Sequence, residues 1–320
     1  MKYLILSFTL LFSVNSFADY KVYATQNQKI NIPEKSGPWV VPSGEPAIHP
    51  NGVTITCLDM SDGEIFDLNG KTYRVVYDKI DAATYASSAC TSNLEDFTSV
   101  FDGQTTFNED ISHWDTSKAT SFRYAFRNAQ LFNKPIGKWN TSNVVNFGQM
   151  FWNAFSFNQN INDWDTSNVK NMSQVFLNNY VFNQPLDKWD TSSVTSMAAM
   201  FIKAHKFNQD ISGWDVSKVT NFQNMFHQNY DFNQDISSWK PLSATNFSGM
   251  FNEATSFNAD ISSWDVSSAT SMHTMFKNAS SFNQDLSTWC VPNIEESDLI
   301  AFDDGTTSWL KSRPSWGGCP

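Results

Sequence analysis

The stretch Phe207-Asn208-Gln209-Asp210-Ile211-Ser212-Gly213-Trp214-Asp215-Val216-Ser217 recurs along the chain in nearly the same form. Its tryptophan returns every 25 residues without an insertion, at Trp114, Trp139, Trp164, Trp189, Trp214, Trp239, Trp264 and Trp289. A fixed period of this length is typical of a solenoid, in which equivalent turns stack on one another. Such a stack offers a long binding face more readily than a catalytic pocket.

Each repeat divides into two halves. Seven residues after each tryptophan from Trp114 to Trp264 stands Ser or Asn, residue types whose side-chain oxygen caps helix N-termini. Apolar residues then follow at helical spacing, as at Val219, Phe222 and Phe226, and predict a short helix near residues 122–129 in the first full copy. The half from Phe-Asn to Trp is expected to be extended. The pattern therefore predicts an α/β solenoid: a leucine-rich-repeat-like stack of eight 25-residue turns, each with a short strand and a short helix.

Three kinds of polar residue repeat with the same period. The eight asparagines from Asn108 to Asn283 are expected to hydrogen-bond the backbone of the neighbouring turn. Two rows of aspartates are expected to accept backbone N–H groups in Asx turns, with bound Ca²⁺ as the second interpretation because stacked like charges repel. A row of threonines is expected to pack between turns, with an ice-binding array as the alternative. The aspartates are Asp165, Asp190 and Asp215 in one row and Asp210, Asp235, Asp260 and Asp285 in the other; the threonines are Thr116, Thr141, Thr166 and Thr191.

The N-terminus has the features of a secretory signal peptide. Lys2 supplies the charge, residues 4–14 an apolar core too short to span a bilayer, and Ser16 and Ala18 the small residues before the expected cleavage after Ala18. No later segment is long and apolar enough for a membrane helix. We therefore expect a secreted or cell-surface protein without a transmembrane segment, with the periplasm as the alternative.

Charge and cysteine content agree with export. Without Lys2, 20 basic residues face 32 acidic ones, a surface that repels nucleic acid, so nucleic-acid binding is excluded. In an oxidising compartment an even number of cysteines is read as disulfides. Three pairings are possible, and the sequential one is favoured because the repeats separate the two groups: Cys57 with Cys90, and Cys290 with Cys319. A zinc site is the alternative.

Outside the repeats, residues 54–57, 65–68 and 72–77 are expected to be strands, and Asn69-Gly70 is a hairpin turn signal. The expected organisation is a signal peptide at 1–18, an extended arm at 19–50 with five prolines, a β-rich N-terminal cap at 51–96, the repeat array at 97–296 and a C-terminal cap at 297–320, with disulfides stapling both caps.

The repeat FNQDISxWDVSxVTxM…MFxxA resembles that of the BspA-type leucine-rich-repeat surface proteins of bacteria, in their 25–26-residue variant. The resemblance covers residues 97–296, and the flanks around Cys57 and Cys319 are also similar. It implies an exported solenoid of the surface or adhesion class without a defined active site. Lys240-Pro241-Leu242, Pro135 and Pro185 depart from the pattern.

No catalytic motif interrupts the repeats. There is no Gly-x-Ser-x-Gly, phosphate loop, His-Glu-x-x-His or dinucleotide fingerprint, and the five histidines occupy unrelated repeat positions. The sequence therefore predicts a protein that is not an enzyme and has no cofactor or metal site, unless Ca²⁺ binds the aspartate rows.

A candidate binding site lies where the repeats differ from one another. Two positions, directly after the second ladder phenylalanine and three residues later, become apolar or aromatic only in the central turns. Exposed aromatic patches mark interaction sites, although the second position could also be half-buried. The resulting stripe consists of Trp152, Phe155, Leu177, Tyr180, Ile202, His205, His227 and Tyr230.

These features favour an exported, non-enzymatic binding module, adhesin-like, that recognises a protein or glycan on a cell surface or matrix. The alternative is a structural spacer or matrix component without a specific ligand.

Overall fold

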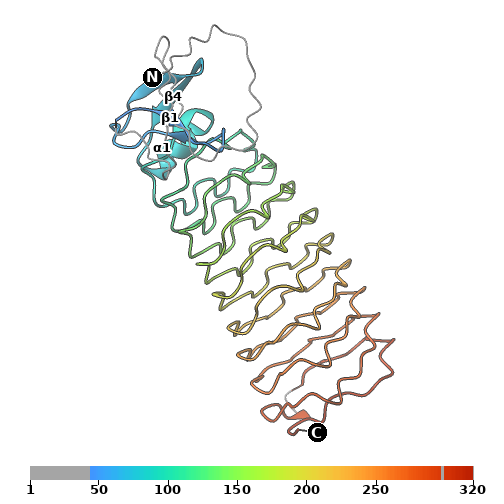
Figure 1. Ribbon diagram of the computed structural model, residues 1–320. Coiled ribbons are helices and arrows are strands. Elements are labelled where there is room, and N and C mark those ends of the chain that lie inside the picture. The colour runs from blue at the N-terminus through green and yellow to red at the C-terminus, as the bar shows by residue number, and fades with distance from the viewer. Residues whose placement is uncertain (1–43, 297–298, 320) are drawn as a thin grey trace, which may run out of the picture.

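The computed structural model describes residues 44–296 and 299–319, and it consists of a small cap followed by a long stack of similar turns (Figure 1). The expected signal peptide at 1–18 and the expected arm up to residue 43 lie outside the described residues. In the part of the chain that is described, no helix has the length and apolar character needed to cross a membrane.

Five short strands form the framework of the cap. β1 (Ala47–Ile48) pairs antiparallel with β2 (Ile55–Thr56), while β3 (Ile65–Leu68) and β4 (Lys71–Val75) form an antiparallel hairpin. β5 (Ala89–Cys90) runs parallel to β4. Because β1 lies inside the segment expected to be an extended arm, the cap begins earlier than residue 51.

The sequence signals for the hairpin are confirmed. Asn69 and Gly70 have φ of 54° and 76°, the left-handed pair that a two-residue type I′ turn requires and that Asn-Gly adopts readily. The sequence did not reveal the helix α1 (Lys79–Thr84) or the 3₁₀ turn η1 (Ala86–Ser88) between β4 and β5. Asp78 begins α1 by accepting hydrogen bonds from the N–H groups of Ile80 and Asp81.

The repeats are joined by parallel contacts between residues 25 positions apart. Isolated parallel bridges link Asp96 to Ser121, Ser121 to Asn146, and so on as far as Ser271. In the repeats that the structure describes, no strand forms in the half from Phe-Asn to Trp, so the expected strand of each repeat was wrong. From Ser121 onward, the bridges lie seven residues after a ladder tryptophan, at the positions expected to cap helices.

The prediction of a short helix in each repeat was wrong. Residues 123–128 and their equivalents form consecutive tight turns, with φ of 61° at Tyr124 and 62° at Asn128. Alternate N–H groups leave the segment: Phe122 and Phe126 donate to carbonyls of the next repeat, at Asn146 and Met150. A helix would keep these donors for its own i−4 carbonyls. The apolar spacing does not distinguish the two structures, because successive tight turns also return a side chain to the interior every three or four residues.

The residues expected to cap the helices do have capping contacts. The side chains of Ser121, Asn146 and Asn171 accept hydrogen bonds from the N–H two residues later. The predicted capping hydrogen bonds are therefore present, but they begin a tight turn and not a helix.

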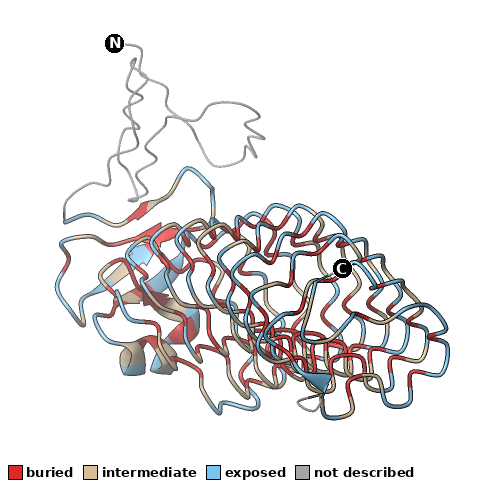
Figure 2. Cartoon of the chain, turned by 90° about the horizontal axis from the view of Figure 1, so that it is seen from below, coloured by how far each residue is buried: buried red, intermediate tan, exposed pale blue. Residues whose placement is uncertain are grey.

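Aromatic rings fill the interior of the stack. The ladder tryptophans are at most 4% exposed, and each of the seven from Trp139 onward donates its Nε1–H to a backbone carbonyl 28 residues earlier, at 3.0–3.1 Å. Phenylalanines stack beside them, as at Phe201 and Phe226 with centroids 5.6 Å apart. Buried and exposed positions alternate around each turn (Figure 2). The prediction of a buried, structural tryptophan ladder is confirmed.

The two ends of the stack are covered. At the N-terminal end, Trp114 donates to the carbonyl of Ala86 in the cap. At the other end, Trp309 meets Phe276 and Phe282 edge-on. The predicted disulfides are both present, Cys57–Cys90 and Cys290–Cys319.

Candidate functional site

The predicted stripe follows the exterior of the tight-turn segment as two parallel columns. The structure brings the four residues of the outer column into one continuous stack of rings. Centroids are 5.3 Å apart for Phe155 and Tyr180, 5.1 Å for Tyr180 and His205, and 4.6 Å for His205 and Tyr230. The interplanar angles of 16–31° show that the rings face one another along the axis of the stack. We call these four residues the aromatic column.

Exposure separates the two columns. Tyr180 and Tyr230 are each 37% exposed, and Phe155 and His205 are half-buried. In the inner column Leu177 is 9% exposed and belongs to the core side, while Trp152, Ile202 and His227 are half-buried. Tyr180 and Tyr230 of the aromatic column are therefore the most exposed residues of the predicted stripe.

Two further apolar residues, which the sequence did not point to, adjoin the aromatic column. Leu131 and Val181, one position beyond Gln130 and Tyr180, are 52% and 41% exposed. The signal was present in the sequence, because Ser156, Lys206 and Asp231 are polar at the equivalent position of other repeats. These two residues widen the apolar surface at its N-terminal end.

A cluster of arginines and aromatic rings closes that end. The guanidinium groups of Arg123 and Arg127 lie 4.5 and 4.4 Å from the ring centroid of Tyr124, and Arg127 lies 5.9 Å from that of Trp152. Arg127 is also paired with Asp102, its Nε donating to the carboxylate at 2.8 Å. Arg127 thus packs over the ring of Trp152, whose buried Nε1 has no hydrogen-bond partner among the described residues.

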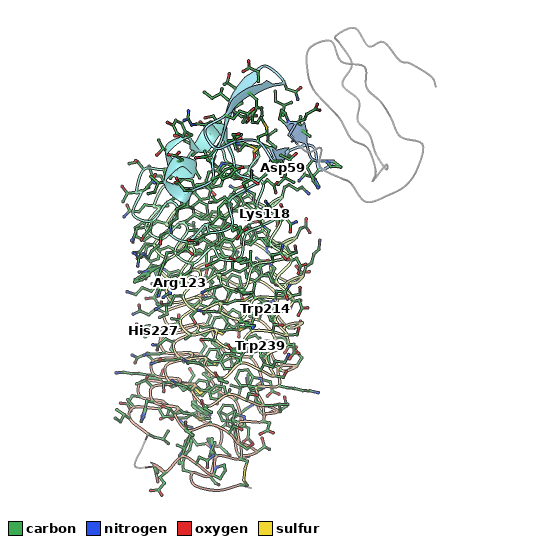
Figure 3. All side chains as sticks on the ribbon, turned by 90° about the vertical axis from the view of Figure 1, so that its left-hand side faces the viewer. Asp59, Lys118, Arg123, Trp214, His227 and Trp239 are labelled. Atoms are coloured by element: carbon green, nitrogen blue, oxygen red, sulfur yellow. A yellow bond between two sulfur atoms is a disulfide. The ribbon has the colours of Figure 1, made fainter. Side chains whose placement is uncertain are left out.

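Lysines and aspartate surround the centre of the column. Burial, assisted by Lys203 and Lys206 and opposed by Asp231, lowers the pKa of His205. Burial likewise lowers the pKa of His227, whose Nδ1 lies 3.0 Å from the carbonyl of Asn252. Both imidazoles are therefore neutral at pH 7, as expected for rings that pack against neighbouring side chains. In Figure 3, Arg123 and His227 lie along one side edge of the stack, with Trp214 and Trp239 in its middle.

The polar rows have structural explanations. Each ladder asparagine from Asn108 to Asn258 accepts, through Oδ1, the N–H of the asparagine 25 residues later at 2.8–3.1 Å. The threonines Thr116, Thr141, Thr166 and Thr191 are buried and donate to carbonyls of the next turn. Both predictions of inter-turn bonding are confirmed, and the buried threonines cannot present an ice-binding array.

The aspartate rows form the predicted Asx turns. Asp165, Asp210 and Asp235 each accept the N–H of the serine two residues later at 2.9–3.1 Å. Hydrogen bonds from the hydroxyl and N–H of Ser237 lower the pKa of Asp235, and equivalent serines do the same for Asp190, Asp210, Asp215, Asp260 and Asp285. Within the described ranges, no three His, Cys, Asp or Glu side chains are grouped to hold a metal ion.

A surface hollow lies where the cap meets the first turns of the stack. It has a volume of about 440 Å³, is wide open, and lies between α1 and the first turns, beside Ile80, Ala83 and Val100. Its lining includes Lys79, Thr84, Ser99 and Gln104 but no carboxylate, histidine or thiol. This hollow therefore holds no acid–base pair or activated nucleophile.

These features define a class of protein, a disulfide-bonded repeat protein with an aromatic column on its exterior. The chain belongs to the family described as "Mycoplasma protein of unknown function, DUF285", whose model matches residues 74–186, 159–246 and 225–305 in three overlapping segments. No curated protein and no solved structure matched the chain.

Proposed function

We propose that this chain is an exported, non-enzymatic binding module, an adhesin-like solenoid of the BspA type, which recognises a protein through the aromatic column. The observation that carries the proposal is the placement of exposed apolar groups. Of the six large apolar side chains of the repeat array that are at least 36% exposed, Leu131, Tyr180, Val181 and Tyr230 adjoin or belong to the column, and Val145 and Leu242 lie elsewhere. Concentration of apolar and aromatic surface at one place marks interaction sites.

The ring geometry favours a protein over a glycan. Sugars pack their C–H groups on the negatively polarised face of an aromatic ring. In the aromatic column the faces are occupied by neighbouring rings at 4.6–5.3 Å, so that mainly ring edges and the two tyrosine hydroxyls point outward. Edges and hydroxyls suit the mixed apolar and polar contacts of a protein interface.

The test uses the purified mature chain on arrays of extracellular proteins and of glycans. Tyr180→Ser with Tyr230→Ser is the variant of choice, because both side chains are exposed and their loss should change the melting temperature little. Trp152→Ser is less suitable, since Trp152 is half-buried beneath Arg127.

We expect the double variant to bind its protein partner at least about ten-fold more weakly, the effect of losing aromatic contacts at the centre of an interface. Val145→Ser with Leu242→Ser removes comparably exposed apolar groups elsewhere and serves as the control. Equal loss in both variants, or unchanged binding in the tyrosine variant, would contradict the proposal. Unchanged binding would favour a structural spacer without a specific ligand.

A further inference from the structure

The outward surface of the aromatic column is electrically positive at short range. An aromatic ring has a negative face and a positive edge. Because the faces of Tyr180, His205 and Tyr230 are turned toward one another, a partner meets ring edges together with the hydroxyl donors of the two tyrosines. Such a surface attracts anionic acceptors more than cations.

Two cations beside the column have no carboxylate partner in the described structure. Arg127 is paired with Asp102, and Lys206 with Asp231 at 2.9 Å. Lys203 and Arg123, in contrast, form no ion pair among the described residues, and the Arg123 guanidinium donates only to the hydroxyl of Tyr124, at 2.7 Å. Arg123 belongs to the cluster at the N-terminal end of the stripe, and Lys203 lies beside His205 at the centre of the column.

The rest of the chain has the opposite sign. The full sequence has a net charge of −11, and the exposed rows of Asp210, Asp235 and Asp260 on another part of each turn keep their carboxylates ionised. An anionic partner is therefore repelled by the acidic rows and attracted by the cations beside the column. This arrangement fixes the docking site and orientation more than the affinity.

The distance between Arg123 and Lys203 along the stack sets the length of a peptide segment that can contact both. Lys203 lies three turns beyond the turn of Arg123, which is roughly 14 Å along the axis if each turn rises by the usual inter-strand distance. An extended peptide covers that length with about four to five residues. A short segment can therefore reach both cations while its apolar side chains lie against Tyr180 and Val181.

We infer that the partner presents an acidic, extended protein segment that lies along the aromatic column, with carboxylates at Arg123 and Lys203 and apolar side chains on the ring edges. This inference rests on the proposed function. An anionic membrane is a poorer match, because a broad surface would also approach the acidic rows of each turn.

Fluorescence anisotropy with three labelled synthetic peptides tests the inference. The peptides share their apolar residues and carry Glu, Gln or Lys at all other positions. We expect the Glu peptide to bind at least about ten-fold more tightly than the Gln peptide, the Lys peptide not to bind, and the Glu affinity to fall as salt is raised.

Charge reversal then locates the site. Arg123→Glu with Lys203→Glu should weaken the Glu peptide at least about ten-fold, whereas Lys118→Glu with Lys218→Glu, the same charge change at exposed positions elsewhere on the turn, should have a much smaller effect. Equal losses in the two variants, no binding of the Glu peptide, or tighter binding to vesicles containing phosphatidylserine would each overturn the inference.

If all three peptides bind equally and lose affinity with Tyr180→Ser, the proposed function stands and the acidic partner is wrong. If the Glu peptide binds the Tyr180→Ser protein unchanged, the column is not the site.

Discussion

His113 joins the cap to the first turn of the stack, and its titration should control how firmly the two are held together. The side chain is 7% exposed, its Nε2 lies 3.0 Å from the carbonyl of Ala89, and its ring centroid lies 5.5 Å from that of Tyr73. Its carbonyl also accepts the N–H of Ile55. The equivalent side chains of later turns, such as Lys138 and Asp163, are exposed. Burial of His113 is therefore a consequence of cap docking.

The size of the effect follows from the pKa. Burial, with a smaller effect of Lys71, lowers the pKa of His113 from 6.5 to about 4, while the Ala89 carbonyl and Asp110 act in the opposite direction. The folded protein thus holds His113 neutral, and the unfolded chain takes up the proton first as the pH falls. The stabilisation is fully present above pH 6.5 and is lost between pH 6.5 and 4. At about 1.4 kcal/mol per pKa unit, the full loss is about 3 kcal/mol.

Urea unfolding at a series of pH values from 7 to 4.5 measures this loss. His113→Gln retains a donor for the Ala89 carbonyl but does not titrate, so it isolates the histidine from the other groups. Between pH 7 and 4.5 we expect the free energy of unfolding of the parent to fall by roughly 2–3 kcal/mol more than that of the variant. Parallel pH profiles for the two proteins would refute the reasoning, because they would show that His113 is not buried by the cap.

Two further predictions concern the core and the caps. Trp189→Ala should lower the free energy of unfolding by about 3–5 kcal/mol, because Trp189 is 3% exposed and stacks between Trp164 and Trp214 at 6.5 Å. Trp189→Phe should cost less but leave the Ile161 carbonyl without its donor, and denaturant unfolding in which either variant matched the parent would contradict a buried ladder. Cys57→Ser with Cys90→Ser removes a cross-link spanning 33 residues, worth about 3.5 kcal/mol in the chain-entropy model. Calorimetry should show a corresponding loss, and a non-reduced digest that joined Cys57 to Cys290 or Cys319 would disprove the pairing.

The sequence alone determined the repeat and most of its chemistry. A period of 25 residues can bury Trp214 and Phe226 only if equivalent turns stack, because a single turn is too small to enclose them. The same reasoning correctly assigned Asn208 and Asp235 to backbone hydrogen bonds, since short polar side chains at fixed positions must satisfy groups that the turns leave free. Export, the solenoid class and the binding role remain predictions.

Only the tertiary structure decided the backbone of each turn and the reachable part of the candidate site. Phe122 and Phe126 have helical spacing, yet their N–H groups donate to the next repeat, and no local pattern reveals that a donor has a better partner 24 residues away. Similarly, Leu177 and Tyr180 both occupy positions whose residue type varies between repeats. Only packing showed that Leu177 is buried and that Tyr180 is exposed within a stack of rings. Periodicity reports which residues are equivalent. The direction in which each one points is set by the neighbouring turns that compete for its backbone and cover its side chain.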